Sequence, residues 1–234
     1  MKNLLSLILI LLLNTIELNA QDKGYIAVSL GPSIPLGDFA SKDIDKESAG
    51  FAKTGAIFDI SFGYKLGKNF GISALLRGQA NKTDAQAMAN EMTSKIPFEM
   101  NVRVESQAWS LGALMVGGYG SFPVEKKFSV ESRLMIGFVS ATLPKVTFDL
   151  SDADGSGWVK RSSTTGTSFA YLIGAGIKYD AGKRVSVLAN IDYMGANPEF
   201  SDVEVTNSIG DYSKDTFSQT FGSINIGFGV GYRL

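Results

Sequence analysis

The chain has 234 residues, and its 22 Lys and Arg residues nearly balance its 23 Asp and Glu residues, which gives a net charge of -1. The basic residues are scattered along the sequence, so the clustered positive charge of a nucleic-acid-binding protein is missing and that class is excluded. The absence of cysteine excludes disulfides, thiolate chemistry and a lipid-modified N-terminal cysteine, and the absence of histidine removes the commonest general base and metal ligand.

Residues 1–20 have the three parts of a secretory signal peptide: Lys2, an apolar run over 4–13, and a polar stretch that ends in Ala20. We predict cleavage before Gln21 and exclude this segment from the fold. A retained membrane anchor is the alternative, but the apolar run is shorter than the ~20 residues that a spanning helix needs. No later run is long enough either, so a helical membrane protein is excluded.

Beyond the signal, apolar and polar residues alternate over successive segments, which is the pattern of strands with one apolar face. The last segment shows it most clearly, because Ile224, Ile226 and Phe228 alternate with Asn225 and Gly227. Such a small or polar second face cannot line an ordinary packed core, so the apolar face is predicted to contact lipid. We predict eight strands, at residues 24–35, 54–66, 69–81, 107–122, 127–142, 166–179, 184–196 and 217–234.

The fourth of these segments is ambiguous, because both of its faces carry apolar residues. Leu114 and Val116 lie on one face. The set assigned to the lipid is the other face, which comprises Trp109, Leu111, Ala113, Met115 and Tyr119.

The connections between segments alternate in length. Tight turns with Gly, Pro and Lys lie at 67–68, 123–126 and 181–183. The other links are long and polar, at 36–53, 82–106, 143–165 and 197–216. Loops above about 15 residues are uncommon in compact soluble domains, whereas outer-membrane barrels have short periplasmic turns and long extracellular loops. The rhythm predicts this second arrangement, with both termini on the periplasmic side.

Aromatic residues of the apolar face gather at two levels. Beside the tight turns lie Tyr64, Phe70, Tyr119, Phe128, Tyr179 and Tyr232. About a membrane's height away along the same strands lie Trp109, Phe138, Phe169 and Tyr193. Because transmembrane barrels carry aromatic girdles at both interfaces, these residues are predicted to lie at the two membrane surfaces.

At this point the chain resembles a known family. The eight strands, the tight turns and the ending Gly229-Val230-Gly231-Tyr232-Arg233-Leu234 are similar to the small outer-membrane β-barrel domains of Gram-negative bacteria, of the OmpA and OmpX type. The resemblance implies an all-β, eight-stranded antiparallel up-and-down transmembrane barrel over residues 21–234, in contact with outer-membrane lipid and lipopolysaccharide. Gly229, Tyr232 and Leu234 match the family's C-terminal signal, which implies insertion by the outer-membrane assembly machinery; the family usually ends in Phe, where this chain has Leu234.

With the apolar face outside, a set of charged side chains points into the barrel. An eight-stranded barrel is only wide enough for side chains to fill it, so charges of both signs should pair, with inward glycines leaving room for the arginines. We predict one network of five residues, namely Asp59, Arg77, Glu131, Arg133 and Asp192. A selective pore or proton path through these groups is the alternative interpretation.

The long links contain weaker signals. Residues 85–92 are good helix formers with Met88 and Met92 one turn apart, which predicts a short helix on the rim or a partner-binding plug. Residues 152–157 begin like a calcium loop, but Ser163 stands where the twelfth position needs Glu, so no metal site is predicted. The acidic link 197–216 is expected to be solvated, and divalent cations bridging it to lipopolysaccharide phosphates are conceivable.

Several functions compete. The favoured one is a non-catalytic outer-membrane barrel, without a cofactor, whose extracellular loops act in surface binding or envelope integrity. Its alternatives are a narrow pore and a lipocalin-like carrier that turns its apolar face inward around a ligand. A barrel enzyme is a further class, but the lipid A acyltransferase, deacylase, phospholipase and protease barrels all use a catalytic His, so their chemistry cannot be carried over to a chain that has none.

Overall fold

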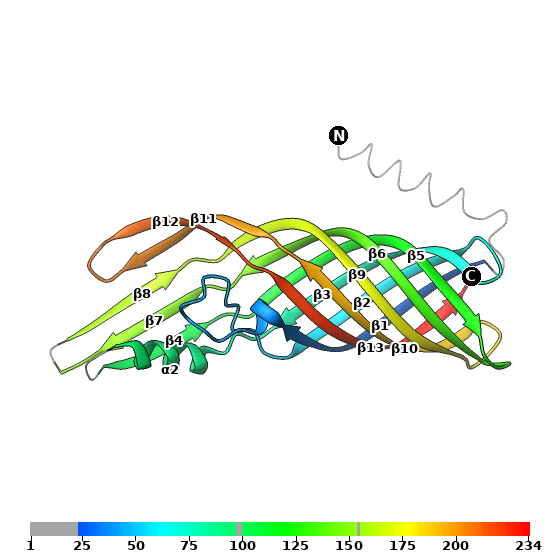
Figure 1. Cartoon of the computed structure of the whole chain (residues 1–234), viewed down its shortest axis with the longest axis horizontal. Coiled ribbons are helices and arrows are strands. Elements are labelled where there is room, and N and C mark those ends of the chain that lie inside the picture. The colour runs from blue at the N-terminus through cyan, green and yellow to red at the C-terminus, as the bar shows by residue number, and fades with distance from the viewer. Residues whose placement is uncertain (1–22, 97–99, 154) are drawn as a thin grey trace.

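The computed structural model describes residues 23–96, 100–153 and 155–234, and the predicted signal peptide lies outside them. Within these ranges, eight antiparallel strands close into a barrel in the order β1-β13-β10-β9-β6-β5-β3-β2 (Figure 1). The barrel strands are β1 (Gly24–Leu36), β2 (Gly55–Lys65), β3 (Phe70–Asn81), β5 (Trp109–Pro123), β6 (Phe128–Leu143), β9 (Thr164–Asp180), β10 (Val185–Ala196) and β13 (Phe221–Arg233). The eight-stranded antiparallel barrel predicted from the sequence is confirmed.

The barrel closes because the first and last strands pair. The register of β1 and β13 runs from Tyr25 opposite Arg233 to Leu36 opposite Gly222. At the end of this seam, the backbone N–H of Leu234 donates to the carbonyl of Gly24 at 2.9 Å. Every barrel strand therefore has two neighbours, and no edge is left unpaired in the wall.

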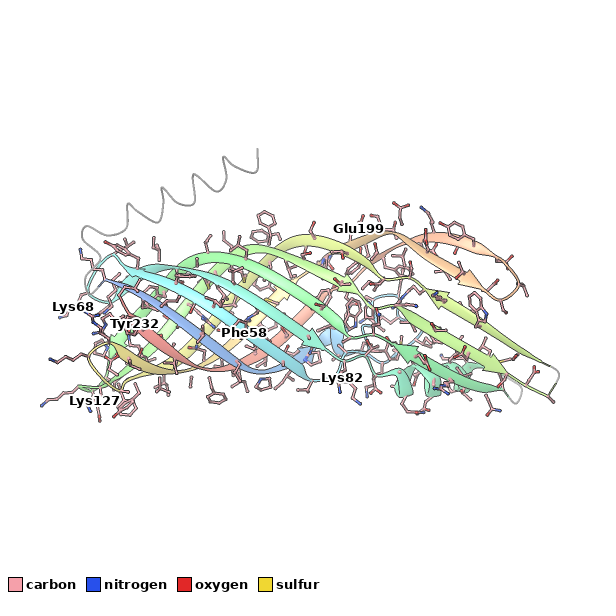
Figure 2. All side chains as sticks on the ribbon, turned by 180° about the vertical axis from the view of Figure 1, so that it is seen from behind. Phe58, Lys68, Lys82, Lys127, Glu199 and Tyr232 are labelled. Carbon is pink, nitrogen blue, oxygen red and sulfur yellow. The ribbon has the colours of Figure 1, made fainter. Side chains whose placement is uncertain are left out.

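The outer surface of the wall is apolar, as the alternation predicts. Phe58 is 53% exposed and Phe228 is 58% exposed, although each lies in the middle of a strand. In Figure 2, Phe58 lies between Lys68 and Lys127 at the tight-turn end and Lys82 and Glu199 at the other end. An apolar band between two charged rims is the arrangement that a bilayer requires of a spanning barrel. No helix of the described residues is long and apolar enough to cross a membrane.

A second sheet extends beyond the barrel, at the end opposite the C-terminus (Figure 1). We call it the distal sheet, and its order is β12-β11-β8-β7-β4. Its strands are β4 (Asn101–Ser106), β7 (Val146–Ser151), β8 (Ser156–Arg161), β11 (Glu199–Asn207) and β12 (Tyr212–Ser218). The sequence predicted only long polar links here. β7 does alternate, with Val146, Phe148 and Leu150 on one face, but it has only six residues and lies inside a link that is polar as a whole.

Two helices lie at the junction of barrel and distal sheet. The helix expected over 85–92 is present as α2 (Ala85–Lys95), which lies beside β4. Asp84 caps it by accepting the backbone N–H of Ala87 at 3.2 Å. A single 3-10 turn, η1 (Gly37–Ala40), follows β1 and buries Phe39 in the barrel mouth.

An aromatic cluster fills this mouth from within. The ring of Phe39 lies 5.8 Å from that of Trp109 and 4.5 Å from that of Phe221. The Trp109 ring also lies 6.1 Å from that of Phe200. The barrel is thus packed shut by apolar side chains at the end from which the distal sheet rises.

Candidate functional site

Four charged side chains meet inside the barrel, and we call them the lumen network. Arg77 of β3 donates through Nε and Nη2 to the two carboxylate oxygens of Asp59 on β2, at 2.8 and 2.7 Å. The same Nη2 donates to Asp192 of β10 at 2.8 Å. Arg133 of β6 donates through Nε and Nη2 to the oxygens of Asp192, at 2.8 and 2.5 Å. Two arginines therefore share two aspartates in one neutral group.

Strand register explains how these residues find one another. Asp59 and Arg77 are directly opposite on neighbouring strands. Arg133 and Asp192 are separated by β9, and both are paired with Gly174 of that strand. A Cβ at Gly174 would lie 2.0 Å from Oδ1 of Asp192 and 3.2 Å from Cγ of Arg133. The missing side chain of Gly174 is what lets the two partners meet across an intervening strand.

The lumen network is sealed from solvent. Asp59, Arg77 and Asp192 are buried, and only Arg133 keeps partial exposure. Charges taken out of water are tolerated only when they are paired and hydrogen-bonded. The bidentate contacts on both aspartates meet that condition and leave neither carboxylate free as a base.

The prediction that Glu131 joins this network is wrong. Glu131 pairs instead with Lys178 of β9, at 3.1 Å, and Lys178 also donates to Ser121 at 3.3 Å. On β6, Glu131 lies two residues closer to the tight-turn end than Arg133, about 7 Å along the strand. The lumen thus holds two separate charged groups at different depths.

The predicted interface aromatics lie on the outer surface in most cases. Phe128 packs against Tyr179 with ring centroids 4.8 Å apart, and Phe138 against Phe169 at 6.3 Å. Tyr193 lies 6.0 Å from Tyr171, which is exposed. The exposed members of the two predicted girdles are Tyr64, Phe70, Phe128, Phe138, Phe169 and Tyr232.

Two of these assignments are wrong, because the fourth predicted strand, β5, faces the other way. Tyr119 is 7% exposed, and its ring stacks edge-on against Tyr25 at 5.6 Å. Trp109 is 2% exposed and lies in the mouth cluster, where its Nε1 donates to the carbonyl of Gly50 at 2.8 Å. Leu114, at 58% exposed, and Val116 form the outer face instead. With apolar residues on both faces, polarity gave no means of telling inside from outside.

The predicted C-terminal signal residues lie on the closing strand. Tyr232 and Leu234 have exposed side chains, and Gly229 is paired with Ser29 of β1 and Leu188 of β10. A Cβ at Gly229 would lie 2.2 Å from the carbonyl oxygen of Val28. This glycine therefore permits the close approach of the first strand to the last, and a role in assembly stays a prediction.

The distal sheet presents charged side chains and two edges. Lys214 pairs with Asp202 at 3.5 Å, and Tyr212 donates to Glu204 at 3.0 Å. Strands β12 and β4 each pair on one side only within the described residues, so both edges offer backbone groups to the surroundings. Among residues 23–96, 100–153 and 155–234, no group of three or more acidic side chains is placed to hold a metal ion.

The structure has an apolar outer band, a filled lumen and a closed barrel of eight strands. A family model that describes such barrels matches almost the whole chain. The model of the outer membrane protein beta-barrel domain matches residues 5–233. This chain belongs to that family. The protein is an outer-membrane β-barrel, and the lipocalin-like alternative is overturned, because the apolar face is turned outward and charged pairs occupy the axis.

The solved structures that this chain is similar to are distant in sequence. The attachment invasion locus protein Ail of Yersinia pestis is 15% identical with a TM-score of 0.45, over 92% of this chain and 99% of that one. Neisserial surface protein A is 12% identical with a TM-score of 0.49, over 90% and 97%. The outer membrane protease OmpT of Escherichia coli is 12% identical with a TM-score of 0.37, over 91% and 97%. No curated protein sequence matches this chain.

Proposed function

We propose that this protein is a non-catalytic outer-membrane barrel that acts at the cell surface through its distal sheet, in surface binding or in envelope integrity. The distal sheet is the observation that carries the proposal. It extends beyond the barrel on the side away from the tight turns and has one-sided edges at β12 and β4. An unpaired strand edge is a template for adding a strand from a partner.

The lumen argues against transport as the main activity. The lumen network crosses the axis, and the mouth cluster closes the end from which the distal sheet rises. The cavities that remain near the tight turns have volumes of about 30 and 20 Å³, enough for single water molecules. A narrow pore stays the second candidate, and steady conductance in planar bilayers would favour it.

The chemistry available to the described residues argues against catalysis. The chain has no histidine or cysteine. The buried aspartates, Asp59 and Asp192, accept hydrogen bonds from arginines on their carboxylate oxygens, so neither carboxylate is free to act as a base.

Its partners are proposed from the same surfaces. Outer-membrane lipid contacts the apolar band, and lipopolysaccharide surrounds the rim near Lys82 and Glu199. The assembly machinery is proposed to read the strand that ends in Tyr232 and Leu234.

The proposal is tested by shortening the β11–β12 hairpin. Residues 204–214 would be replaced by a short Gly-Ser turn, which keeps Val203 and Phe200 buried and leaves the β10–β13 pairing intact. In a deletion strain, the full chain should restore resistance to detergent or adherence to surfaces, and the shortened chain should insert but fail to restore it. Equal complementation by both chains would overturn the proposal.

A further inference from the structure

Arg161 differs from the other arginines of the chain. Arg77, Arg103, Arg133 and Arg233 each have an acidic partner, and Arg184 donates to Tyr232. The guanidinium of Arg161 has no hydrogen bond or ion pair with any described residue, and its Nε is buried. The residue as a whole is half-buried, and a cation that loses part of its hydration without gaining a counter-charge is destabilising.

The surroundings of Arg161 are apolar. Its position on β8 is opposite Val146 of β7 and Val205 of β11. The ring of Phe217 lies 5.6 Å from its guanidinium carbon and covers one face of it. A cation over an aromatic ring gains only part of what a carboxylate would supply. Burial lowers the pKa of Arg161 to about 10, so the group remains charged at neutral pH.

Arg161 lines a small cavity between the barrel mouth and the distal sheet. Trp109, Phe217 and Gln219 share its wall, with Glu47 at the same cavity. The donors of Trp109 and Gln219 are already used, on the carbonyls of Gly50 and Ser48. Arg161 therefore supplies the free donors, while no ion pair joins it to Glu47 among the described residues.

We propose that Arg161 binds one oxyanion group, a phosphate or a sulfate, at the opening of this cavity through its guanidinium. The fork of N–H donors in a guanidinium matches two oxygens of such a group. The cavity volume, about 20 Å³, is enough for about one water-sized atom, so a single oxygen of the group would enter the cavity and the rest of the group would stay at its opening. The inference rests on the proposed function, since it names a ligand chemistry for the surface from which the distal sheet rises.

Trp109 supplies the readout, because it lines the cavity and Trp158 is the other tryptophan of the chain. In purified W158F protein in detergent, titration with sodium sulfate or sodium phosphate should change Trp109 emission beyond the change in sodium chloride of equal ionic strength. R161M should shift the midpoint to at least tenfold higher concentration and should raise the thermal midpoint in anion-free buffer, because a half-buried charge without a partner is removed. The matched control is R103M, whose arginine is exposed in the same sheet, and it should titrate like the parent.

Two results would overturn the site. One is an equal sulfate response in the parent and R161M. The other is destabilisation by both R161M and E47Q with strong coupling between them, which would make Glu47 the partner of Arg161. If R161M fails to fold, R161K serves instead and should weaken binding, because an ammonium lacks the planar fork.

Titrations in nanodiscs distinguish a phosphate that belongs to lipopolysaccharide from a free or ligand-borne anion. A phosphate response that disappears when lipopolysaccharide is included assigns the site to a lipid-borne phosphate, and a response that persists assigns it to a free or ligand-borne anion. The titrations need no cellular phenotype. If Trp109 emission does not respond to sulfate or phosphate while the shortened hairpin still fails to complement the deletion strain, the anion site alone is overturned.

Discussion

Arg77 on β3 contacts Asp192 on β10 across the barrel, with Nη2 of the arginine 2.8 Å from a carboxylate oxygen of the aspartate. The two residues are 115 positions apart in the sequence, and both are buried. Because Arg77 holds Asp59 with the same guanidinium, this one side chain ties together strands that do not pair with each other.

Removing Arg77 should therefore destabilise the barrel strongly. R77M leaves Asp59 without its arginine and Asp192 with one instead of two, which should cost on the order of 3–5 kcal/mol. Urea unfolding of the barrel in lipid vesicles measures this cost. R103M is the control, because Arg103 and Glu105 form an exposed pair that should contribute at most about 1 kcal/mol. Equal effects of the two changes would contradict a structural role for the lumen network.

The separation of Glu131 from that network is testable by a double-mutant cycle. E131Q and R77M share no partner, so their effects on unfolding free energy should add to within about 0.5 kcal/mol. E131Q and K178M remove two ends of one ion pair and should couple by at least that amount. Strong coupling between Glu131 and Arg77 would restore the single network that the sequence predicted.

Gly174 should be intolerant of any side chain. In G174A the new methyl group meets Oδ1 of Asp192 at 2.0 Å and must displace the carboxylate from Arg133. We expect a loss of about 1–3 kcal/mol, the usual range for overpacking. G112A, on β5, is the matched control, because nothing lies within 4 Å of the Cβ position of Gly112. Its effect on stability should stay within about 0.5 kcal/mol. Thermal unfolding of the two variants side by side decides the matter.

The inward position of Trp109 is open to a direct optical test. In W158F, brominated lipids should leave Trp109 emission nearly unchanged, since its ring is packed against Phe39, Phe200 and Phe221 inside the mouth. F138W in a background without the native tryptophans places the indole on the outer face, and the same lipids should quench it. Strong quenching of Trp109 would return β5 to the orientation expected from the sequence.

The sequence predicted the barrel because a lipid-facing strand differs in polarity on its two faces. Where that contrast exists, as with Phe58 beside Asp59, inside and outside follow from alternation alone. On β5 the contrast is missing, since Met115 and Leu114 are both apolar and only packing decides which is buried. That one ambiguity explains why Tyr119 and Trp109, predicted on the outer face, lie inside the barrel.

Other features depend on information that alternation does not contain. Glu131 and Arg133 share a face, so the sequence places both in the lumen, but the depth of their partners depends on the stagger between strands. The distal sheet was missed for two reasons: β12 is exposed on both faces and has no apolar stripe, and β7 has one over only six residues inside a polar link. Arg161 carried no signal either, because its isolation is a property of residues that come together from β12, α2 and the mouth.

The N-terminal cap of α2 should make the junction sensitive to acid. Asp84 accepts a hydrogen bond from Lys42 at 2.7 Å and one from the backbone of Ala87, and the contact with Lys42 is the main reason that the pKa of Asp84 lies below its ordinary value. A carboxylate with a lowered pKa stabilises the folded state above its ordinary pKa, and this contribution is lost as the pH falls through the lowered value, below about pH 4.

Amide hydrogen exchange in α2, corrected for intrinsic rates, should therefore show protection that is constant at neutral pH and falls in acid. D84N keeps a capping oxygen without a titrating group and should flatten this acid response, whereas D84A should lower protection at all pH values by about 1 kcal/mol. If D84N retains the full acid response, the titrating group is not Asp84, and the link between the cap and the rim of the barrel is wrong.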